Sequence, residues 1–472
     1  MPSRVGGIGL ARLSILALCA CALLAAANPG HAGAAFDDDW HYDLIYTRSG
    51  KVFRGLLVAE TPECVKFWRI IRSPGRPTRR MFWSYETADI ARIERLGAQQ
   101  HQVLEARVQA LDPDHEKQCL EKLNLLPIAW DGQPDGGFSY RSDYFLLVSD
   151  APEEIVRRAA FRLDRIYAAL ASAMPPRRIA PPTKIVLVRS QKEYHERLAS
   201  RGLSFLNPAF YDRDRQEIVC ACNLERLGSE LSTIRREHQQ KRERIWSQER
   251  ALEREYHGNV PLKLSRPLSQ QLAALAEVDR ANERQFEESS KRFFETLYHE
   301  ACHAYVSTFV YFKRDRLPCW LQEGLAQIFE TAILDGMEFR IGHRDPQRVE
   351  RLRNAGRRAE LPGLVGLLCS TSGQFIAGHA QDKAATDSYY LSAWALTHYL
   401  VFDRELLGTP EFDVYIAALA NGADPVAAFE QLVGEPPAQF LKGMPTELRL
   451  DLNSADNSNS QSRSSTIEIR SK

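Results

Sequence analysis

Two histidines and a glutamate stand together in the motif HEACH. His299 and His303 are four residues apart, and Glu300 follows the first histidine. On an α-helix this spacing places both imidazoles on one face, about one turn apart, so both can reach the same metal ion. A glutamate beside such a pair accepts a proton from the attacking water and returns it to the leaving group. The motif predicts a metal site with a general base, although the same pattern also arises by chance in surface and core helices.

The segments that flank the motif favour the metal site. FFETLY precedes it and AYVSTFV follows it, so the predicted helix is apolar on nearly every side. His299, Glu300 and His303 would then be polar groups in a largely buried element. Buried polar groups need partners, and a metal ion would supply them.

A second helix is predicted to return to the motif with a third ligand. KRDRLP breaks the first helix, Pro318 suits the start of the next one, and CWLQEGLAQIFETAI then has helical character. Glu323 on this second helix follows His303 by twenty residues, which is enough for the chain to fold back. Two neutral imidazoles, one carboxylate and an open position for water form a catalytic zinc set. We therefore expect Zn²⁺ to be held by His299, His303 and Glu323.

HEACH followed by WLQEG resembles the gluzincins, and most closely the peptidase-MA-like domains, whose second motif often reads W-L-x-E-G-x-A. The resemblance covers residues 139–441 and implies a zincin-like zinc metallopeptidase that hydrolyses a peptide or protein substrate. It matches His299, Glu300, His303 and Glu323 individually to the ligands and the general base of that family.

A downstream segment, DSYYLSAWALTHYLV, resembles the Y-x-x-x-W helix of the same family. Tyr390, Trp394 and His398 are four residues apart and share a helix face. The resemblance implies that Tyr390 donates a hydrogen bond to the oxyanion of the tetrahedral intermediate, with His398 as the second candidate. The alternative is that these aromatic side chains pack in the core.

One position departs from the family pattern. Many gluzincins have an acidic residue one turn after the third ligand, where it accepts the remaining N–H of a ligand histidine. This chain has Gln327 there. An amide oxygen can accept the bond without a charge, and Asp387 and Glu330 are the other possible acceptors.

The N-terminal third divides into three predicted segments. Residues 1–34 combine a short basic region, the apolar run LSILALCACALLAAA and small residues suited to signal-peptidase cleavage. Residues 37–97 contain short alternating strands separated by Gly and Pro breaks, which resembles a small SH3-like or Sm-like β-barrel. Residues 98–138 are predicted to be a helical linker that ends at the Gly-rich segment DGQPDGG.

The remaining chain is predicted to be an α+β zincin-like domain over residues 139–441, with a mainly helical C-terminal half. Residues from about 224 to 289 are dense in charge and predict a helical insertion with solvated faces. The tail, residues 453–472, is polar, low in complexity and predicted to be disordered.

Composition limits the partners. Lys plus Arg and Asp plus Glu number 61 each in the 472 residues, so the net charge gives no reason to expect nucleic acid as the partner. No segment after the signal peptide is apolar over the roughly 20 residues that a membrane span needs. We expect an exported protein, periplasmic or secreted, without an integral membrane segment.

Two other functions remain open at this level. The first is a zincin-like module that binds peptides or cell-envelope components without cutting them. The second is a structural envelope assembly protein whose histidines only complete a buried helix junction. The sequence identifies neither the substrate nor the oligomeric state.

Overall fold

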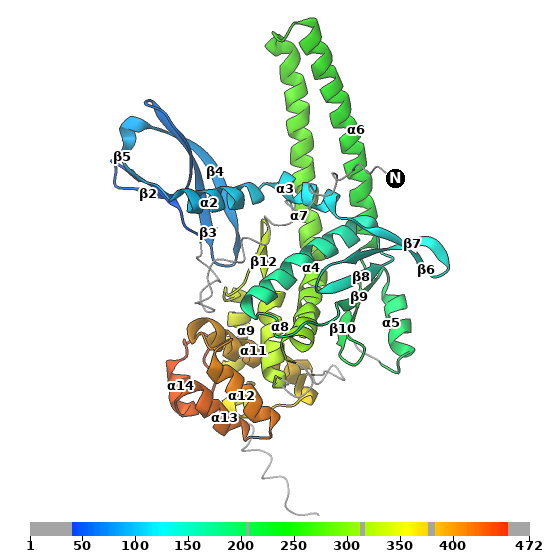
Figure 1. The fold of residues 1–472 in the computed structure, drawn as a ribbon, viewed down its shortest axis with the longest axis vertical. Coiled ribbons are helices and arrows are strands. Elements are labelled where there is room, and N and C mark those ends of the chain that lie inside the picture. Colours follow the sequence, from blue (N-terminus) through cyan, green and yellow to red (C-terminus); the bar gives the residue numbers. More distant parts are fainter. Residues whose placement is uncertain (1–39, 204–206, 312–316, 376–382, 452–472) are drawn as a thin grey trace, which may run out of the picture.

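The structure is a computed structural model that describes residues 40–203, 207–311, 317–375 and 383–451. The predicted signal peptide and the predicted disordered tail lie outside the described residues. Sheets occupy the N-terminal part and helices make up the C-terminal half, so the predicted α+β class is confirmed (Figure 1). Among the helices that the structure describes, none is both long enough and apolar enough to cross a membrane.

Residues 43–94 form a curved antiparallel sheet in the order β4-β3-β2-β1-β5 (Figure 1). Its strands are β1 Asp43–Thr47, β2 Val52–Glu60, β3 Cys64–Ser73, β4 Arg76–Glu86 and β5 Ile90–Glu94, with a short 3-10 turn at Thr87–Asp89. The predicted closed barrel was wrong. Within the described chain β4 pairs only with β3 and β5 only with β1, so the two edges do not join.

The start of β4 is bonded to the C-terminal half, which helps to explain the open sheet. Thr78 donates its backbone N–H to Asp335 at 2.9 Å and its hydroxyl to the same carboxylate at 2.6 Å. Arg340 contacts Asp335 at 3.0 Å and donates to the carbonyl of Ser73 at 2.8 Å. A barrel would instead need β4 to bond along β5. The residues that hold β4 belong to a hairpin of two strands, β12 Ile333–Asp335 and β13 Glu338–Arg340.

The predicted linker, residues 98–138, is more ordered than its composition indicates. It contains two helices, one strand and part of another: α2 Ala98–Ala110, α3 Pro113–Lys122, β6 Leu126–Trp130 and β7 Gln133–Arg141. The Gly-rich segment is a hairpin, because Asp131 and Gly132 have φ of +46° and +80° and so form the tight turn between β6 and β7. The second sheet therefore begins at Leu126.

The second sheet has the strand order β10-β11-β9-β8-β7-β6, in which β8, β9 and β11 are parallel. Its further strands and the helices beside it are β8 Phe145–Ser149, α4 Glu153–Ala173, β9 Thr183–Val188, α5 Gln191–Ala199, β10 Ala209–Asp212 and β11 Glu217–Ala221. Alternate residues of β9 face opposite sides. Ile185 and Leu187 join the large core with α4, whereas Val186 and Val188 pack with Tyr194 of α5.

Two long helices form an arm that extends from the core (Figure 1). They are α6, Glu225–Glu255, and α7, Leu262–Tyr305. The 44 residues of α7 correspond to roughly 66 Å at 1.5 Å per residue. The part of α7 from Phe286 onward contributes to the large core, through residues such as Leu297 and Ala301. The arm and the HEACH motif therefore belong to one continuous helix.

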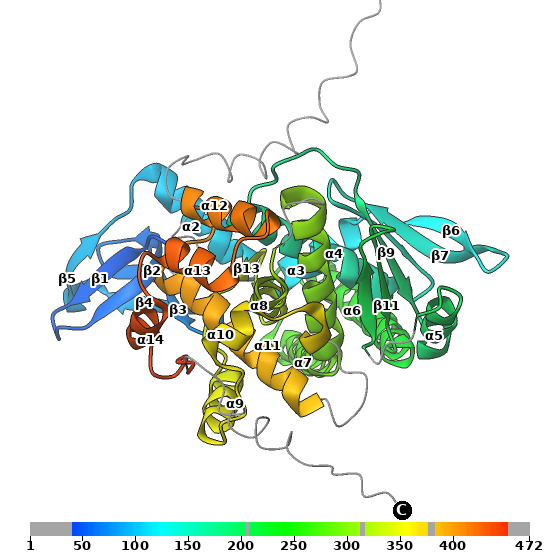
Figure 2. The same ribbon diagram turned by 90° about the horizontal axis from the view of Figure 1, so that it is seen from below.

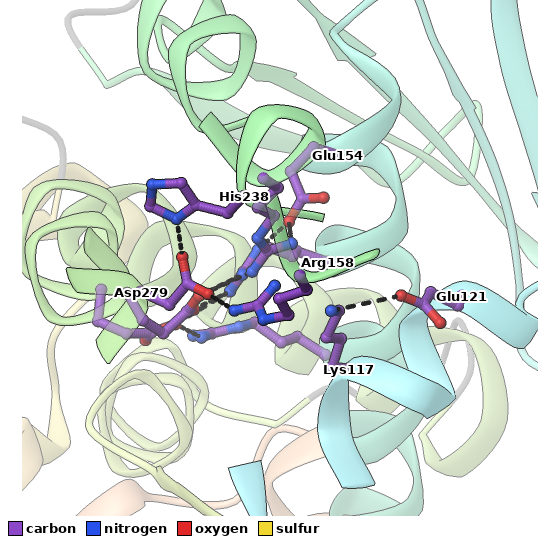
Figure 3. Close-up of polar contacts among 11 residues, drawn as sticks. Lys117, Glu121, Glu154, Arg158, His238 and Asp279 are labelled. Carbon is purple, nitrogen blue, oxygen red and sulfur yellow. Dashed lines mark hydrogen bonds and ion pairs between the residues drawn. The ribbon is translucent and has the colours of Figure 1, made fainter. Parts of the chain in front are cut away.

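Ion pairs attach the arm to α4 (Figure 3). Arg158 of α4 is 1% exposed and lies 2.7 Å from Glu154 and 2.6 Å from Glu283 of α7. Farther along the arm, His238 of α6 contacts Asp279 of α7 at 2.5 Å. Removing one partner of a buried ion pair leaves an uncompensated charge, so the contact of Arg158 with Glu283 resists separation of the arm from α4, while that of His238 with Asp279 holds α6 to α7.

The C-terminal half packs helices around α8 and α11 (Figure 2). Trp320 of α8 and Trp394 of α11 are almost fully buried in the same core as the end of α7. Both α7 and α11 continue into π-helical turns. The elements of this half are the π turn Val306–Val310, α8 Cys319–Glu330, α9 Pro346–Arg357, α10 Gly363–Leu368, the 3-10 turn Ser372–Phe375, α11 Lys383–His398, the π turn Tyr399–Asp403, α12 Pro410–Ala420, α13 Pro425–Val433 and α14 Pro437–Gly443.

Gly324 permits the close contact between α8 and α11. A Cβ atom at this position would lie 2.0 Å from the hydroxyl oxygen of Thr397 and 2.6 Å from the carbonyl oxygen of Ala393. Both separations are far shorter than a van der Waals contact, so any side chain would push the helices apart. Because Glu323 is the preceding residue, this packing also sets its position.

Gly324→Ala should lower the free energy of unfolding by about 1–3 kcal/mol, because the added methyl group overpacks this contact. Chemical denaturation followed by tryptophan fluorescence measures the change. Gly366→Ala on α10 is the matched control, since its Cβ would meet Pro362 at an ordinary 3.8 Å. It should be neutral or slightly stabilising. Equal stability of both variants would contradict the packing argument.

Candidate metal centre

The C-terminal end of α7 presents both histidines of the motif on one side. The ring centres of His299 and His303 are 4.8 Å apart, and their Nε2 atoms are 3.1 Å apart. Neighbouring residues on the other sides of the helix, Ala301, Cys302 and Ala304, are fully buried in the core. The helix is therefore held firmly while the two imidazoles converge.

Glu323 of α8 completes the group. Its Oε2 atom lies 3.4 Å from Nε2 of His299 and 3.6 Å from Nε2 of His303. One ligand atom from each of these three residues lies within 4.8 Å of the others. The side chains predicted to hold Zn²⁺ thus come together from two helices, although Glu323 follows His303 by twenty residues.

The separations fit a tetrahedral metal. Zn–N and Zn–O bonds of about 2.0–2.1 Å at a tetrahedral angle place the ligand atoms about 3.3 Å apart. The three observed separations are 3.1, 3.4 and 3.6 Å. Oε2 of Glu323 is also buried without a hydrogen-bond partner in the described structure. Both observations match a donor set built for a cation.

Glu330 accepts a hydrogen bond from the second ring nitrogen of His299. Nδ1 of His299 lies 3.1 Å from Oε2 of Glu330, which leaves the Nε2 lone pair free for the metal. Arg348 of α9 holds this carboxylate at 2.8 Å and also donates to the carbonyl of Gln327 at 3.0 Å. Of the two acidic acceptors considered from the sequence, Asp387 instead contacts Arg351 at 3.4 Å.

Gln327 has a different role from the acid that usually stands at its position. Its amide donates to the backbone carbonyl of Tyr390 at 2.8 Å and to that of Glu323 at 3.3 Å. The side chain joins α8 to α11 and bonds neither imidazole in the structure. Its contribution is to the position of the two helices.

Glu300 lies between the histidines and the edge strand of the second sheet. The residue is 8% exposed, and the backbone of Tyr211 in β10 lies near enough to its carboxylate to favour the charged form. Burial raises its pKa above the usual value, while the charges of His299 and His303 oppose the rise. A carboxylate with a raised pKa is better suited to hold a proton briefly.

The two candidate oxyanion donors occupy different surroundings. Tyr390 donates its hydroxyl to the carbonyl of Phe375 at 3.1 Å. Burial and then the negative charges of Glu323 and Glu300 raise its pKa. His398 follows eight residues later, roughly 12 Å along the helix.

His398 is engaged in contacts of its own. Its Nε2 atom bonds the carbonyl of Gly342 at 3.1 Å, and its ring packs between Trp394 and Phe402. Burial lowers its pKa to about 4, so the ring is neutral near pH 7. These contacts place His398 in the core around Gly342, and the structure does not bring it into the group formed by His299, His303 and Glu323.

Two supporting residues could not be found from the sequence. Arg348 holds Glu330 from a different helix, and Tyr211 reaches Glu300 through a backbone atom. Neither position carries a motif or a spacing relative to HEACH. Only the packing of α9 and β10 against the site reveals them.

A comparison with family models gives one match. Residues 294–412 match a model described as a protein of unknown function, DUF1570. The matched region contains HEACH, Glu323 and Tyr390, and so coincides with the metal centre. No curated protein and no solved structure matches the chain.

The affinity for zinc should depend on pH through His299. Burial disfavours its charged form, but the nearby carboxylates of Glu323 and Glu330 outweigh burial and raise its pKa well above 6.5 when no zinc is bound. Because zinc binds the neutral ring, affinity should rise about tenfold per pH unit until the pH passes this pKa. Competition with a zinc-binding dye across the neutral and mildly alkaline range measures the slope.

Glu330→Gln tests the cause of this slope. The substitution removes one of the carboxylates that raise the pKa of His299, so the affinity should level off at a lower pH than in the unaltered protein. The plateau should also be about 10–100-fold weaker, because the ring loses its orienting acceptor. Glu350→Gln, on the outer face of α9, is the matched charge control. Superimposable profiles for all three proteins would argue against the role of Glu330.

Proposed function

We propose that the protein is an exported zinc metallopeptidase with a zincin-like, gluzincin-type catalytic domain. The observation that carries the proposal is the set of separations among Nε2 of His299, Nε2 of His303 and Oε2 of Glu323, which match a tetrahedral zinc site. The signal-peptide pattern of residues 1–34 supports export to the periplasm or the outside of the cell.

Each residue of the site has a separate role in the proposed hydrolysis. A bound zinc ion would act as a Lewis acid toward the substrate carbonyl and would lower the pKa of water in the site. Glu300 accepts the proton of the attacking water and passes it to the leaving nitrogen. Glu330 and Arg348 keep His299 in the tautomer with its Nε2 lone pair toward the ion. Tyr390 would donate a hydrogen bond to the developing oxyanion once its hydroxyl leaves the carbonyl of Phe375.

The neighbouring strand supports a peptide substrate. In the described structure β10 lies at the edge of the second sheet, with β11 as its only partner strand. An extended peptide can add to such an edge through backbone hydrogen bonds. Since this strand packs against α7 and the backbone of Tyr211 lies near Glu300, a peptide there would lie beside the proposed base.

Glu300→Gln and His303→Ala separate catalysis from metal binding. Glu300→Gln should retain one zinc per chain but lose hydrolysis by at least about 10²-fold, because the amide cannot accept the proton. His303→Ala should lose both, since a ligand is missing. Metal content by mass spectrometry and turnover on a peptide library give the two readouts. Glu295→Gln on the same helix is the control. Zinc binding without turnover in the unaltered protein would favour a binding module, and the absence of zinc would favour a structural role.

Tyr390→Phe tests the oxyanion role. Loss of its hydroxyl should lower kcat by about 10²-fold or more with little change in KM or zinc content, because the bond forms only in the transition state. Tyr389→Phe, one residue earlier on α11, should leave kcat unchanged. An unchanged kcat in Tyr390→Phe would assign this residue to packing and to its contact with Phe375.

A further inference from the structure

A cavity of about 370 Å³ lies on the N-terminal sheet, between the start of β2 and the end of β3. Three arginines line it, Arg54, Arg69 and Arg72, together with apolar residues that include Phe53 and Ile71. No acidic residue is among the lining residues. Its volume is within the range of pockets that bind small ligands.

Two of these arginines are fixed by stacking. The guanidinium carbon of Arg69 lies 4.9 Å from the ring centre of Phe53, and that of Arg72 lies 4.5 Å from the ring centre of Trp40. Stacking holds the guanidinium plane and leaves the N–H edges available for an anion. Nε of Arg72 is buried without a hydrogen-bond partner in the described structure.

The positive charge around the cavity has no local compensation. Residues 40–97 contain eleven Lys and Arg but six Asp and Glu, although the whole chain has 61 of each kind. Asp43 accepts the N–H groups of Leu57 and Leu96, and Glu60 pairs with Arg95. Over the part of the chain that the structure describes, no carboxylate forms a salt bridge with any of the three cavity arginines. An anion entering the cavity would meet an uncompensated positive field.

We propose that this cavity binds an acidic peptide segment, with a carboxylate on the arginines and a neighbouring apolar side chain against the aliphatic and aromatic wall. Guanidinium groups bind carboxylates in bidentate geometry. A lipid surface is a poorer match, because Arg69 and Arg72 are partly buried in a concave and partly apolar site. The cavity binds its ligand whether or not the metal centre hydrolyses peptides.

The cavity is also connected to the second half of the molecule. Ser73, at its rim, accepts a hydrogen bond from Arg340 at 2.8 Å. Arg340 belongs to β13, in the hairpin that follows α8. A peptide in the cavity would therefore lie beside a residue that is hydrogen-bonded to β13, the strand in the hairpin that follows α8 and Glu323.

Fluorescence anisotropy with two labelled peptides tests the proposal. The probes are fluorescein-Gly-Ser-Gly-Glu-Leu as the free acid and fluorescein-Gly-Ser-Gly-Gln-Leu as the amide, added to full-length mature protein that carries Glu300→Gln so that neither is consumed. The acidic peptide should bind at least about tenfold more tightly than the neutral one. Arg54→Gln and Arg72→Gln should each weaken its binding about tenfold.

Matched variants distinguish a specific binding site from non-specific electrostatic attraction. Arg79→Gln removes the same charge from an exposed position of β4 outside the lining and should change the affinity by less than about twofold. Arg69→Lys keeps the charge but loses the planar fork, so it should still weaken binding. Thermal unfolding verifies that each variant is folded. Because Arg54 is exposed, Arg54→Gln should have little effect on the stability of the protein.

Three results would overturn the inference. One is equal loss of affinity in Arg79→Gln and Arg54→Gln, which indicates non-specific attraction. Another is equal binding of the acidic and neutral peptides. The third is binding to phosphatidylglycerol vesicles that depends on Arg54 and Arg72 while the acidic peptide fails to bind, which would assign the cavity to lipid phosphate.

Discussion

The candidate metal centre depends on the packing of α8 between α7 and α11. Glu323 must place a buried carboxylate within 3.4 and 3.6 Å of two imidazoles, and Gly324 allows the close approach that does so. A buried carboxylate is costly unless a positive group faces it. The rings of His303 and His299 face this carboxylate, so the pKa of Glu323 is lowered despite burial, and the carboxylates of Glu323 and Glu330 in turn raise the pKa of His299. Two imidazoles and one carboxylate at these separations would also favour the binding of a divalent cation.

The arm also affects the positions of the two histidines, because α7 is continuous from the arm to the HEACH motif. Arg162 of α4 stacks on Phe294 at 4.2 Å and donates to the hydroxyl of Tyr298 at 3.3 Å, directly before His299. It also pairs with Glu287, one of the carboxylates that surround Arg158. The polar contacts at the base of the arm therefore extend to the residue beside the first ligand. Since a helix transmits tilt along its length, these contacts hold the direction of the imidazoles as well as the arm.

Local spacing explains which parts of the site were predictable. His299 and His303 are brought together by one helical turn, and Glu323 by a short return, so the sequence was sufficient for all three. Glu330 could only be named as one of two acidic acceptors, because its contact with His299 depends on how α8 packs against α7. The barrel failed for a similar reason: the bonds of Thr78 to Asp335 span 257 residues and leave no local signal. Asp131 and Gly132 did carry a hairpin signal, but the surrounding glycines favoured a linker.

The amide at Gln327 is consistent with the charge of the site. Glu300, Glu323 and Glu330 contribute three carboxylates, and Arg348, which is 9% exposed, contributes one guanidinium. A divalent cation with neutral imidazoles would bring this set to electrical neutrality. A fourth carboxylate at position 327 would leave one buried negative charge without a partner, which is costly in a low dielectric. Gln327 joins the helices through the carbonyl of Tyr390 without that cost, because Glu330 and Arg348 already supply the charged acceptor and its balance.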